Sequence, residues 1–336
     1  MRQYSEVEQT GAGAQRYPGN CQIAVIIPCY NEEITIESVV LDFRAELPSA
    51  AIYVFDNNSS DRTVEIAEKI GAIVRHEQRQ GKGYVVQTMF RTVDADIYIL
   101  VDGDATYAAS GVHDLIAPII RGEADMVVGS RLQAKSASEF RVLNRLGNRM
   151  FLWVLNSTFK SRITDVLSGY RAFSRQFAKS IPLFGGGFEI ETEMTIKALE
   201  RGYRVVEVTS KLSARPEGSS SKIRIVQDGI LILNTILTLF RDYKPLTFFG
   251  IAGLLLMAAG LVPGLVVISE FLRTGLVSRL PSAVLAAGLE LAGMLSISVG
   301  LVLHTLARHS QELDLQLRNL TAEIHNHIDK VSYGRN

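Results

Sequence analysis

The chain has 336 residues, 47% of them hydrophobic, and its 35 basic and 35 acidic side chains leave no formal net charge. This composition excludes a disordered chain, which would carry more charge and fewer apolar residues. The neutral balance argues against a protein that binds nucleic acid over its whole surface, because binding to phosphates needs a basic excess. Cys21 and Cys29 lack zinc or redox spacing and form no disulfide framework, which predicts a reduced chain that faces the cytosol.

Short apolar runs alternate with helical patterns between residues 23 and 129. The runs predict strands at Ile23–Pro28, Ala51–Phe55, Ile73–His76, Ile97–Val101 and Asp125–Gly129. Helices are predicted from a cap at Asn31, over Val64–Ile70, from Gly81–Gly83 onward, and over Val112–Arg121. This alternation is typical of an α/β fold with a mainly parallel, twisted sheet covered on both faces.

Acidic residues stand at the ends of two predicted strands, where α/β sheets bind their ligands. Asp56 ends one strand, and Asp102 and Asp104 follow another. Because Gly103 lets the backbone approach a ligand, the two carboxylates beside it can share a hard divalent cation, Mg²⁺ or Mn²⁺, with phosphate oxygens and water. An ordinary polar turn is the alternative, but the position after a buried strand favours a metal–diphosphate site.

Two long apolar runs lie near the C-terminus. Leu246–Ser269 has no charged residue and Pro281–His304 has only Glu290. At ~1.5 Å per residue, each run can span a hydrocarbon core of ~30 Å. The short link between them predicts an antiparallel transmembrane hairpin, although buried helices of a soluble protein would also be apolar. Residues 1–20 lack a signal peptide, so we expect the part of the chain before the hairpin and both termini on the cytoplasmic side of the inner membrane.

The second run and the tail carry two further patterns. Small residues recur every four positions, at Gly288, Ala292, Ser296 and Gly300, and predict a close helix contact from which Glu290 points away. An intramembrane carboxylate is a functional candidate, or a protonated group bonded within the bundle. Apolar residues from Leu306 to Val331 recur at alternating spacings of three and four residues, which predicts a coiled coil and a homo-oligomer. Packing of the tail onto its own catalytic domain is the alternative.

Nine segments follow one another in a recognisable order. They are IIPCYNEE (26–33), VFDNNSSDRT (54–63), RQGKG (79–83), LVDGDATY (100–107), VVGSRL (127–132), DVLSGYRAF (165–173), GFEIETEM (187–194), RGYRVVEV (201–208) and RPEGSSSKIRIVQDG (215–229). In this order the chain resembles family 2 glycosyltransferases of the GT-A fold, in particular the dolichol-phosphate mannosyltransferase-like enzymes that act on polyprenyl phosphates.

The resemblance and the hydropathy pattern together predict the domain organisation. The expected parts are a polar tail (1–20), a GT-A domain (21–222), juxtamembrane amphipathic helices (223–245), a transmembrane hairpin (246–304) and a cytoplasmic helical tail (305–336). Val142–Leu155 and Ile225–Phe240 are apolar stretches that could lie at the lipid headgroups and bring a polyprenyl tail to the site, or pack in the core.

The resemblance also implies roles for the donor side. Base and ribose of a nucleotide sugar would be held by Pro28, Tyr30, Glu32 and Asp56, and the metal and diphosphate by Asp102, Gly103 and Asp104. Lys82 starts a helix, where its charge and free N–H groups suit phosphate, unless it is a solvated surface lysine. Asn57 departs from the pattern, since many relatives have a second Asp there, and this leaves the base contact open.

On the acceptor side the resemblance implies that Arg131 and Arg145 bind a lipid phosphate, while Arg215 and Lys222 belong to a segment near the active site. Singly, each would be read as a surface cation, but a lipid phosphate beside a diphosphate needs counter-charge. A phosphate monoester, with its second pKa near ~6, is already nucleophilic at neutral pH and needs no general base. Asp165 and Glu191 are therefore assigned to shaping the sugar site.

The predicted function is inverting transfer of a sugar from a UDP- or GDP-sugar to a polyprenyl (undecaprenyl or dolichyl) phosphate. Transfer to a sugar hydroxyl of a lipid-linked glycan is an alternative, and it would need a carboxylate base among Asp165, Glu189 and Glu191. A non-catalytic nucleotide-binding membrane scaffold is the other. A processive polysaccharide synthase is disfavoured, because Leu152 precedes the single tryptophan, Trp153, so the Gln-x-x-Arg-Trp segment is absent.

Overall fold

The computed structural model describes residues 21–131, 152, 155–157, 159–187, 189–212, 237, 238, 240–242 and 244–333. The chain divides into two compact units, Met1–Leu233 and Asn234–Asn336, which are described separately. Most of the two predicted headgroup-level stretches, Val142–Leu155 and Ile225–Phe240, lies outside the described residues. The finer domain boundaries given above remain predictions.

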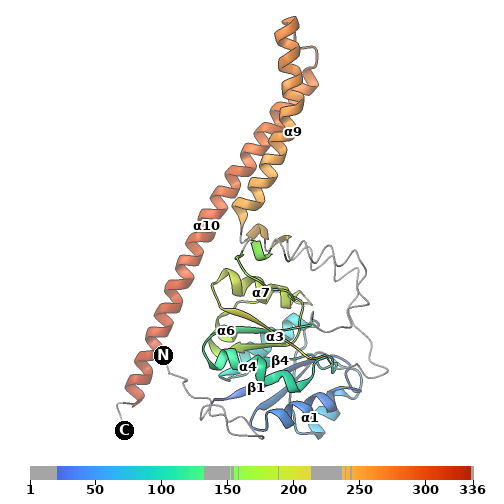
Figure 1. The fold of residues 1–336 in the computed structure, drawn as a ribbon, viewed down its shortest axis with the longest axis vertical. Helices are drawn as coiled ribbons and strands as arrows, with labels where there is room; N and C mark the ends of the chain where they lie inside the picture. Colours follow the sequence, from blue (N-terminus) through green and yellow to red (C-terminus); the bar gives the residue numbers. More distant parts are fainter. Residues whose placement is uncertain are drawn as a thin grey trace. The chain divides into compact units, whose positions relative to one another are not determined.

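The first unit is built on one mixed sheet (Figure 1). Its strands are β1 (Ile23–Cys29), β2 (Ala51–Asp56), β3 (Ile73–His76), β4 (Ile97–Leu100), β5 (Met126–Ser130), β6 (Arg171–Ser174) and β7 (Val205–Thr209). They lie in the order β3-β2-β1-β4-β6-β5-β7, and only β6 runs antiparallel to its neighbours β4 and β5. The five predicted strands and the mainly parallel α/β sheet are confirmed, whereas β6 and β7 were not predicted.

Helices cover both faces of this sheet. They are α1 (Ile36–Glu46), α2 (Thr63–Lys69), α3 (Lys82–Thr92), the 3-10 turn η1 (Ala109–Gly111), α4 (Val112–Ile120), α6 (Arg175–Ser180) and α7 (Ile190–Glu200). Because successive strand residues point to opposite faces, Val25 and Ile27 pack with α1, α2 and α4, while Ala24 and Ile26 pack with α3, α6 and α7. This double cover explains why the strands are apolar along their whole length.

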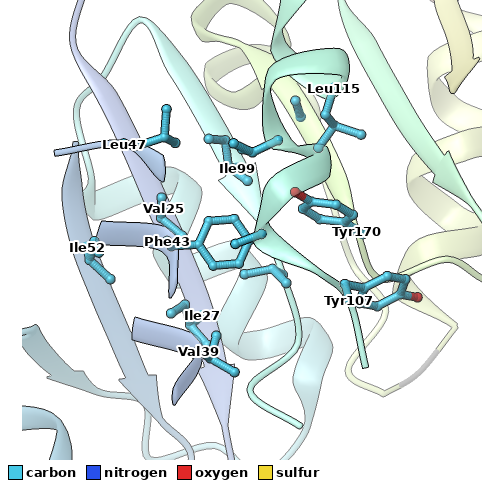
Figure 2. Packing of buried hydrophobic residues seen from close by; sticks show 14 of the residues in the cluster. Val25, Ile27, Val39, Phe43, Leu47, Ile52, Ile99, Tyr107, Leu115 and Tyr170 are labelled. Carbon is cyan, nitrogen blue, oxygen red and sulfur yellow. The ribbon is translucent and has the colours of Figure 1, made fainter. Parts of the chain in front are cut away.

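The core on the α1 side reaches to the edge where the acidic residues stand. Figure 2 shows Phe43 of α1 among Val25, Ile99 and Tyr170. The Phe43 and Tyr170 rings meet edge-on with their centroids 6.1 Å apart, and Tyr107 lies 5.3 Å from Tyr170. Tyr107 follows the Asp102–Asp104 turn and Tyr170 precedes β6. The aromatic contacts therefore fix two loops of the candidate site to the core.

The loop after β1 differs from the prediction. Asn31 was expected to cap a helix, but α1 begins only at Ile36, and Asn31 has a left-handed φ of 54°. Its side-chain oxygen accepts a hydrogen bond from the backbone N–H of Ser60, 2.7 Å away. The residues after β1 thus bond to the loop after β2, as the Glu32 N–H also does with the Thr63 hydroxyl at 2.8 Å. Asn31 serves a loop–loop contact because asparagine tolerates this backbone region.

The second unit contains the predicted helical hairpin. Helix α9 (Pro245–Thr274) ends at Gly275, whose φ of 70° suits a glycine cap, and α10 (Leu280–Tyr333) returns alongside it. Both helices are long and apolar enough to cross a membrane. Only 17% of each apolar window is buried, whereas a core helix of a soluble protein would be mostly covered. Helix α10 continues without a break as far as Tyr333, within the predicted tail.

The two helices meet along small residues spaced seven apart. Gly253 and Gly260 of α9 and Ala286, Gly293 and Gly300 of α10 lie in this contact. A Cβ on Gly253 would lie 2.6 Å from the Gly293 carbonyl oxygen, and one on Gly293 would lie 2.8 Å from the Gly253 oxygen. Glycine is therefore required where the backbones touch, and the seven-residue spacing keeps the contact on one side of each helix.

The predicted four-residue stripe is only half correct. Ser296 belongs to the contact, since its hydroxyl donates to the Phe249 carbonyl at 2.9 Å. Gly288 has nothing within 4 Å of its Cβ position, and Ala292 is exposed. Glu290 faces α9, since its Oε1 lies 3.3 Å from the Cβ position of Gly260. Spacing alone could not tell which side of α10 faces α9.

Gly293 lies in the contact with α9 and Gly288 does not, so substitutions at these two positions form a matched pair. Gly293→Leu should force the two helices apart and lower the free energy of unfolding by about 1–3 kcal/mol, because overpacking a close contact strains the backbone. Gly288→Leu changes the same residue type in the same helix and should leave stability unchanged. Thermal unfolding of the full chain in one detergent measures both, and an equal effect of the two variants would contradict the described seam.

Candidate functional site

The Asp102–Asp104 turn packs directly on the end of β1. A Cβ on Gly103 would lie 2.8 Å from the Cys29 sulfur, so glycine is required there. The Thr35 hydroxyl, at the start of α1, donates to the Gly103 carbonyl at 2.6 Å. The Asp104 Oδ1 accepts from the Thr106 N–H at 3.0 Å. The turn is therefore held from both sides, which fixes where its carboxylates stand.

The Asp102 carboxylate is confined between a lysine and a glycine. Its Oδ1 lies 2.5 Å from Lys82 Nζ, and a Cβ on Gly169 would lie 2.2 Å from its Oδ2. The same ammonium lies 2.5 Å from Oε1 of Glu191, at the start of α7. Burial disfavours the charge of Lys82, yet Asp102 and Glu191 together raise its pKa above the ordinary value. Lys82 is therefore a buried cation shared by two carboxylates and no solvated surface lysine.

Two glycine-rich loops bring Lys82 to this position. Gly81 and Gly83 flank it at the start of α3, and a Cβ on either would lie 2.0 Å from a carbonyl oxygen of Gly185 or Gly186. The Gly83 N–H donates to the Gly186 carbonyl at 3.1 Å. The N–H groups of the next two residues bond to the Gly81 carbonyl. The N–H groups of Gly83, Tyr84 and Val85 are therefore used by the loop contact and the first helical turn, and these three are not free for phosphate.

Asn57 is part of the support for that loop. Its side-chain amide donates to the carbonyls of Glu77 and Arg79 at 2.9 and 2.8 Å, and its Oδ1 accepts from the Gly81 N–H at 2.7 Å. It is 4% exposed. Beside it, hydrogen bonds from Arg79 lower the pKa of Glu77 to about 2. The departure noted in the sequence thus has a structural role, since an aspartate cannot donate these bonds.

The residues expected to hold the nucleotide lie at the ends of β1 and β2. Asp56 is buried, accepts from the Ser59 N–H at 3.2 Å, and has its Oδ2 3.3 Å from His76 Nδ1 of β3. Tyr30 is 41% exposed. The Cγ of Glu32 lies 3.5 Å from the Cβ position of Gly103, which joins this group to the acidic turn. Pro28 pairs with Phe55 one position before the strands end.

Arg131 follows β5 and forms a two-pronged ion pair with Asp165. Its Nε and Nη2 lie 2.8 and 2.9 Å from the two carboxylate oxygens, and its backbone N–H donates at 3.0 Å. Burial would raise the pKa of Asp165, but Arg131 holds it below its usual range. The charge of Asp102 acts on Arg131 and helps to raise the pKa of the guanidinium. The Arg131 side chain as a whole is 32% exposed.

Three predicted acceptor-side residues, Arg145, Arg215 and Lys222, lie outside the described residues. Of the three candidate bases, Asp165 has both oxygens bonded and Glu191 is paired with Lys82. Glu189 differs. Its Oε1 accepts from the Gly187 N–H at 2.9 Å, while its Oε2 is buried without a hydrogen-bond partner among the described residues.

The comparisons with known proteins agree with this geometry. The sequence profile described as Glycosyl transferase family 2 matches residues 24–181. Glycosyltransferase AglJ of Haloferax volcanii is 32% identical over 272 residues, which are 80% of this chain and 88% of that protein.

The chain belongs to glycosyltransferase family 2.

Other relatives and solved structures extend this result. Protein RfbJ of Shigella flexneri is 51% identical over 119 residues, covering 35% of this glycosyltransferase and 92% of RfbJ. Dolichyl-phosphate hexose transferase of Haloferax volcanii is 31% identical over 186 residues, covering 55% of this chain and 80% of that one. Glucosyl-3-phosphoglycerate synthase of Mycobacterium tuberculosis superposes with a TM-score of 0.53 at 24% identity, over 66% of this chain and 81% of the other. That likeness shows the GT-A-like fold alone.

The donor atoms of the acidic turn suit a hard divalent cation. Carboxylate oxygens are the ligands that Mg²⁺ and Mn²⁺ prefer, and Mg²⁺ is often bound through one or two carboxylates plus substrate phosphates. Among the described residues there is no group of three or more His, Cys, Asp or Glu that could enclose an ion alone. Asp102 and Asp104 thus have the donor chemistry that such an ion takes, and an ion there would need further ligands from elsewhere.

Sequence reasoning missed several residues that build this glycosyltransferase site. Gly169 lies inside the quoted DVLSGYRAF segment. Its contact with Asp102 depends on the loop that leads into β6, a strand that was not predicted. Gly185 and Gly186 lie in a run of three glycines, which was a usable signal for close backbone packing. Thr35 carried no signal, because its partner, the Gly103 carbonyl, is distant in sequence.

Asn57→Asp tests the loop support. The variant loses two donated hydrogen bonds and places a carboxylate against two carbonyl oxygens, which should lower the free energy of unfolding by about 1–3 kcal/mol. Asn58→Asp is the control: it also loses two donated bonds, to the Gln78 carbonyl and to Gln80 Oε1, but Asn58 is exposed, so water can replace them, and its φ of 64° is tolerated by aspartate. Chemical unfolding of both variants measures the effect, and a stability of Asn57→Asp equal to that of the control would refute the assigned role.

Gly169→Ala tests the confinement of Asp102. The added methyl group would overlap Oδ2 and displace the carboxylate, so we expect binding of a nucleoside diphosphate with Mn²⁺ to weaken by about tenfold or more. Gly111→Ala is the control, since nothing lies within 4 Å of its Cβ position. Isothermal titration calorimetry gives both dissociation constants; unchanged affinity in Gly169→Ala would show that Asp102 does not bind the diphosphate.

Proposed function

We propose that this glycosyltransferase transfers a sugar from a UDP- or GDP-sugar to a polyprenyl phosphate at the cytoplasmic face of a membrane. The observation that carries the proposal is the position of Arg131: it follows β5 at the edge of the sheet where Asp102 follows β4, Asp165 holds its guanidinium, and its side chain is 32% exposed. It offers a binding group for a second phosphate beside the group expected to hold the donor diphosphate. The relative named dolichyl-phosphate hexose transferase and the apolar hairpin support the choice of acceptor.

In this proposal the donor lies along the ends of β1, β2 and β4. Pro28, Tyr30, Glu32 and Asp56 contact the base and ribose, and the Asp102–Asp104 turn meets the diphosphate. When bound there, a divalent cation would offset the charge that develops on the leaving nucleotide. Crystals of the M. tuberculosis synthase that contain Mn²⁺ and UDP-glucose support such an ion for this fold. Lys82 supplies a second positive charge next to Asp102.

The acceptor phosphate is bound by Arg131, and we include Arg145, Arg215 and Lys222 in this group by the family resemblance. An oxygen of the lipid phosphate attacks the anomeric carbon, and a new carbon–oxygen bond forms to the lipid. The bond to the nucleoside diphosphate breaks with its electron pair, which leaves on the nucleotide. The configuration inverts, and no proton is removed because the acceptor is already a dianion. Asp165 orients Arg131, and Glu191 orients Lys82.

Transfer to a hydroxyl group is the second candidate, favoured by one observation. A hydroxyl acceptor needs a carboxylate base, and the free Oε2 of Glu189 could take that proton. Asp165 and Glu191 are less suited, because both are engaged in ion pairs. Glu189→Gln separates the two functions: it should abolish transfer to a hydroxyl and leave transfer to a phosphate largely intact.

Homo-oligomerisation remains part of the proposal. Leu306 and Leu313 are exposed in the single chain, as the first positions of a coiled coil would be before assembly. The transmembrane hairpin is proposed to take part in the same assembly.

The acceptor assignment can be tested with the full chain in detergent. Arg131→Lys should raise the KM for undecaprenyl phosphate by about tenfold or more, because a lysine cannot form the two-pronged contact with Asp165 that orients the cation. The KM for the nucleotide sugar should change by less than about threefold. The product is identified by mass after a screen of UDP- and GDP-sugars, with undecaprenol as a negative acceptor. Arg121→Lys, at an exposed pair with Glu123, is the control.

Equal effects of Arg131→Lys on both KM values would remove Arg131 from the acceptor site. If undecaprenol or a lipid-linked glycan accepted the sugar and undecaprenyl phosphate did not, the hydroxyl mechanism would replace the proposed one.

A further inference from the structure

Arg171 is a fully buried cation that the proposed reaction does not use. It stands at the start of β6, paired with Leu100 of β4 and Val128 of β5, and is 0% exposed. Its guanidinium has no ion pair with a carboxylate among the described residues. An isolated charge is expensive to bury, so its hydrogen bonds must offset the lost hydration.

Those hydrogen bonds go to two separate parts of the site. Nη2 donates to the Val166 carbonyl at 2.5 Å and Nε to the Ser168 carbonyl at 2.8 Å, so both bind the segment before β6. Nη1 donates to the Thr195 hydroxyl of α7 at 2.8 Å. The Thr195 hydroxyl in turn donates to the Glu191 carbonyl at 2.9 Å, one helical turn earlier. One rigid guanidinium therefore ties a loop to a helix.

The residues held by these hydrogen bonds are adjacent in sequence to residues of the candidate site or belong to it. Asp165, the partner of Arg131, directly precedes Val166, and Gly169, against which Asp102 lies, directly follows Ser168. Glu191 carries one of the two carboxylates on Lys82. The charges of Glu191 and Asp165 also act on Arg171. A shift of the loop against α7 would thus change the distance between the Arg131–Asp165 pair and the Lys82–Asp102–Glu191 group.

We propose that Arg171 is a positioning residue that holds the Arg131–Asp165 pair in register with the Lys82–Asp102–Glu191 group. Calling the Arg131–Asp165 pair the acceptor side and the Lys82–Asp102–Glu191 group the donor side rests on the proposed function. The role of Arg171 in holding the two groups in register does not. Arginine suits this task because its planar fork offers five N–H donors in fixed directions, whereas a lysine ammonium cannot bind two carbonyls and a hydroxyl in the same geometry.

Arg171→Lys keeps the charge and removes the fork. We expect its KM for undecaprenyl phosphate to rise by about fivefold or more, because two of its bonds hold the Asp165 segment. The KM for the nucleotide sugar should rise by a smaller factor, since Asp102 keeps its direct contact with Lys82. Thr195→Val removes only the bond to α7 and should show a smaller change of the same kind. Arg175→Lys, at an exposed pair with Asp94, is the control and should behave as the parent chain.

Two readouts separate positioning from a general loss of packing. In a double-mutant cycle, Arg171→Lys should add little to the KM effect of Arg131→Lys, because both act through the same pair; additive effects would overturn the proposal. Amide hydrogen exchange should increase in segments 163–170 and 190–196 of Arg171→Lys and stay unchanged in β1 to β3. Exchange that rises everywhere, or nowhere, would overturn it as well.

The exchange measurement needs no acceptor. If the parent chain failed to use undecaprenyl phosphate but the exchange pattern were as expected, the proposed function would fall and the positioning role would stand. If transfer occurred and neither kinetics nor exchange changed in Arg171→Lys, the positioning role alone would fall. Should Arg171→Lys fail to fold, Thr195→Val decides: local exchange changes in 163–170 support the proposal and their absence contradicts it.

Discussion

The candidate site depends on how the Asp102 carboxylate is confined. One oxygen meets the Lys82 ammonium and the other occupies the space where a side chain at position 169 would begin. Lys82 is in turn fixed by glycine, because Gly81 and Gly83 on either side of it contact Gly185 and Gly186 of a second loop. The carboxylate therefore has little freedom to turn, and a group that is already oriented loses less entropy when a ligand binds.

Charge is balanced around this carboxylate. Asp102, Asp165 and Glu191 are matched by Lys82, Arg131 and Arg171, so these six residues together carry no net charge, and Asp104 adds one negative charge to the acidic turn. Two incoming phosphates would upset that balance, which is why further cations are part of the proposal. The pairing also explains why Asp165 suits orientation better than proton removal: Arg131 bonds to both of its oxygens and lowers its pKa.

Much of this arrangement could be predicted from the sequence, because apolar strands in a parallel sheet bring Asp56 and Asp102 to one edge wherever the helices lie. The predictions that were wrong depended on contacts with residues distant in sequence. Asn31 has the chemistry of a helix cap, but a loop distant in sequence bonds to its side chain. Gly288 and Gly293 both fit small-residue patterns, and only the position of α9 distinguishes them. Strand β6 was missed because its sequence RAFS begins with a charged residue and forms no apolar run, although Arg171 is buried.

The most direct test is a structure of the full chain with Mn²⁺, a nucleoside diphosphate and undecaprenyl phosphate, determined by cryo-electron microscopy in lipid nanodiscs. The account predicts the diphosphate and the metal at Asp102 and Asp104, and the lipid phosphate on Arg131. A diphosphate bound elsewhere while Asp102 keeps its contacts with Lys82 and Gly169, or a lipid phosphate distant from Arg131, would contradict it.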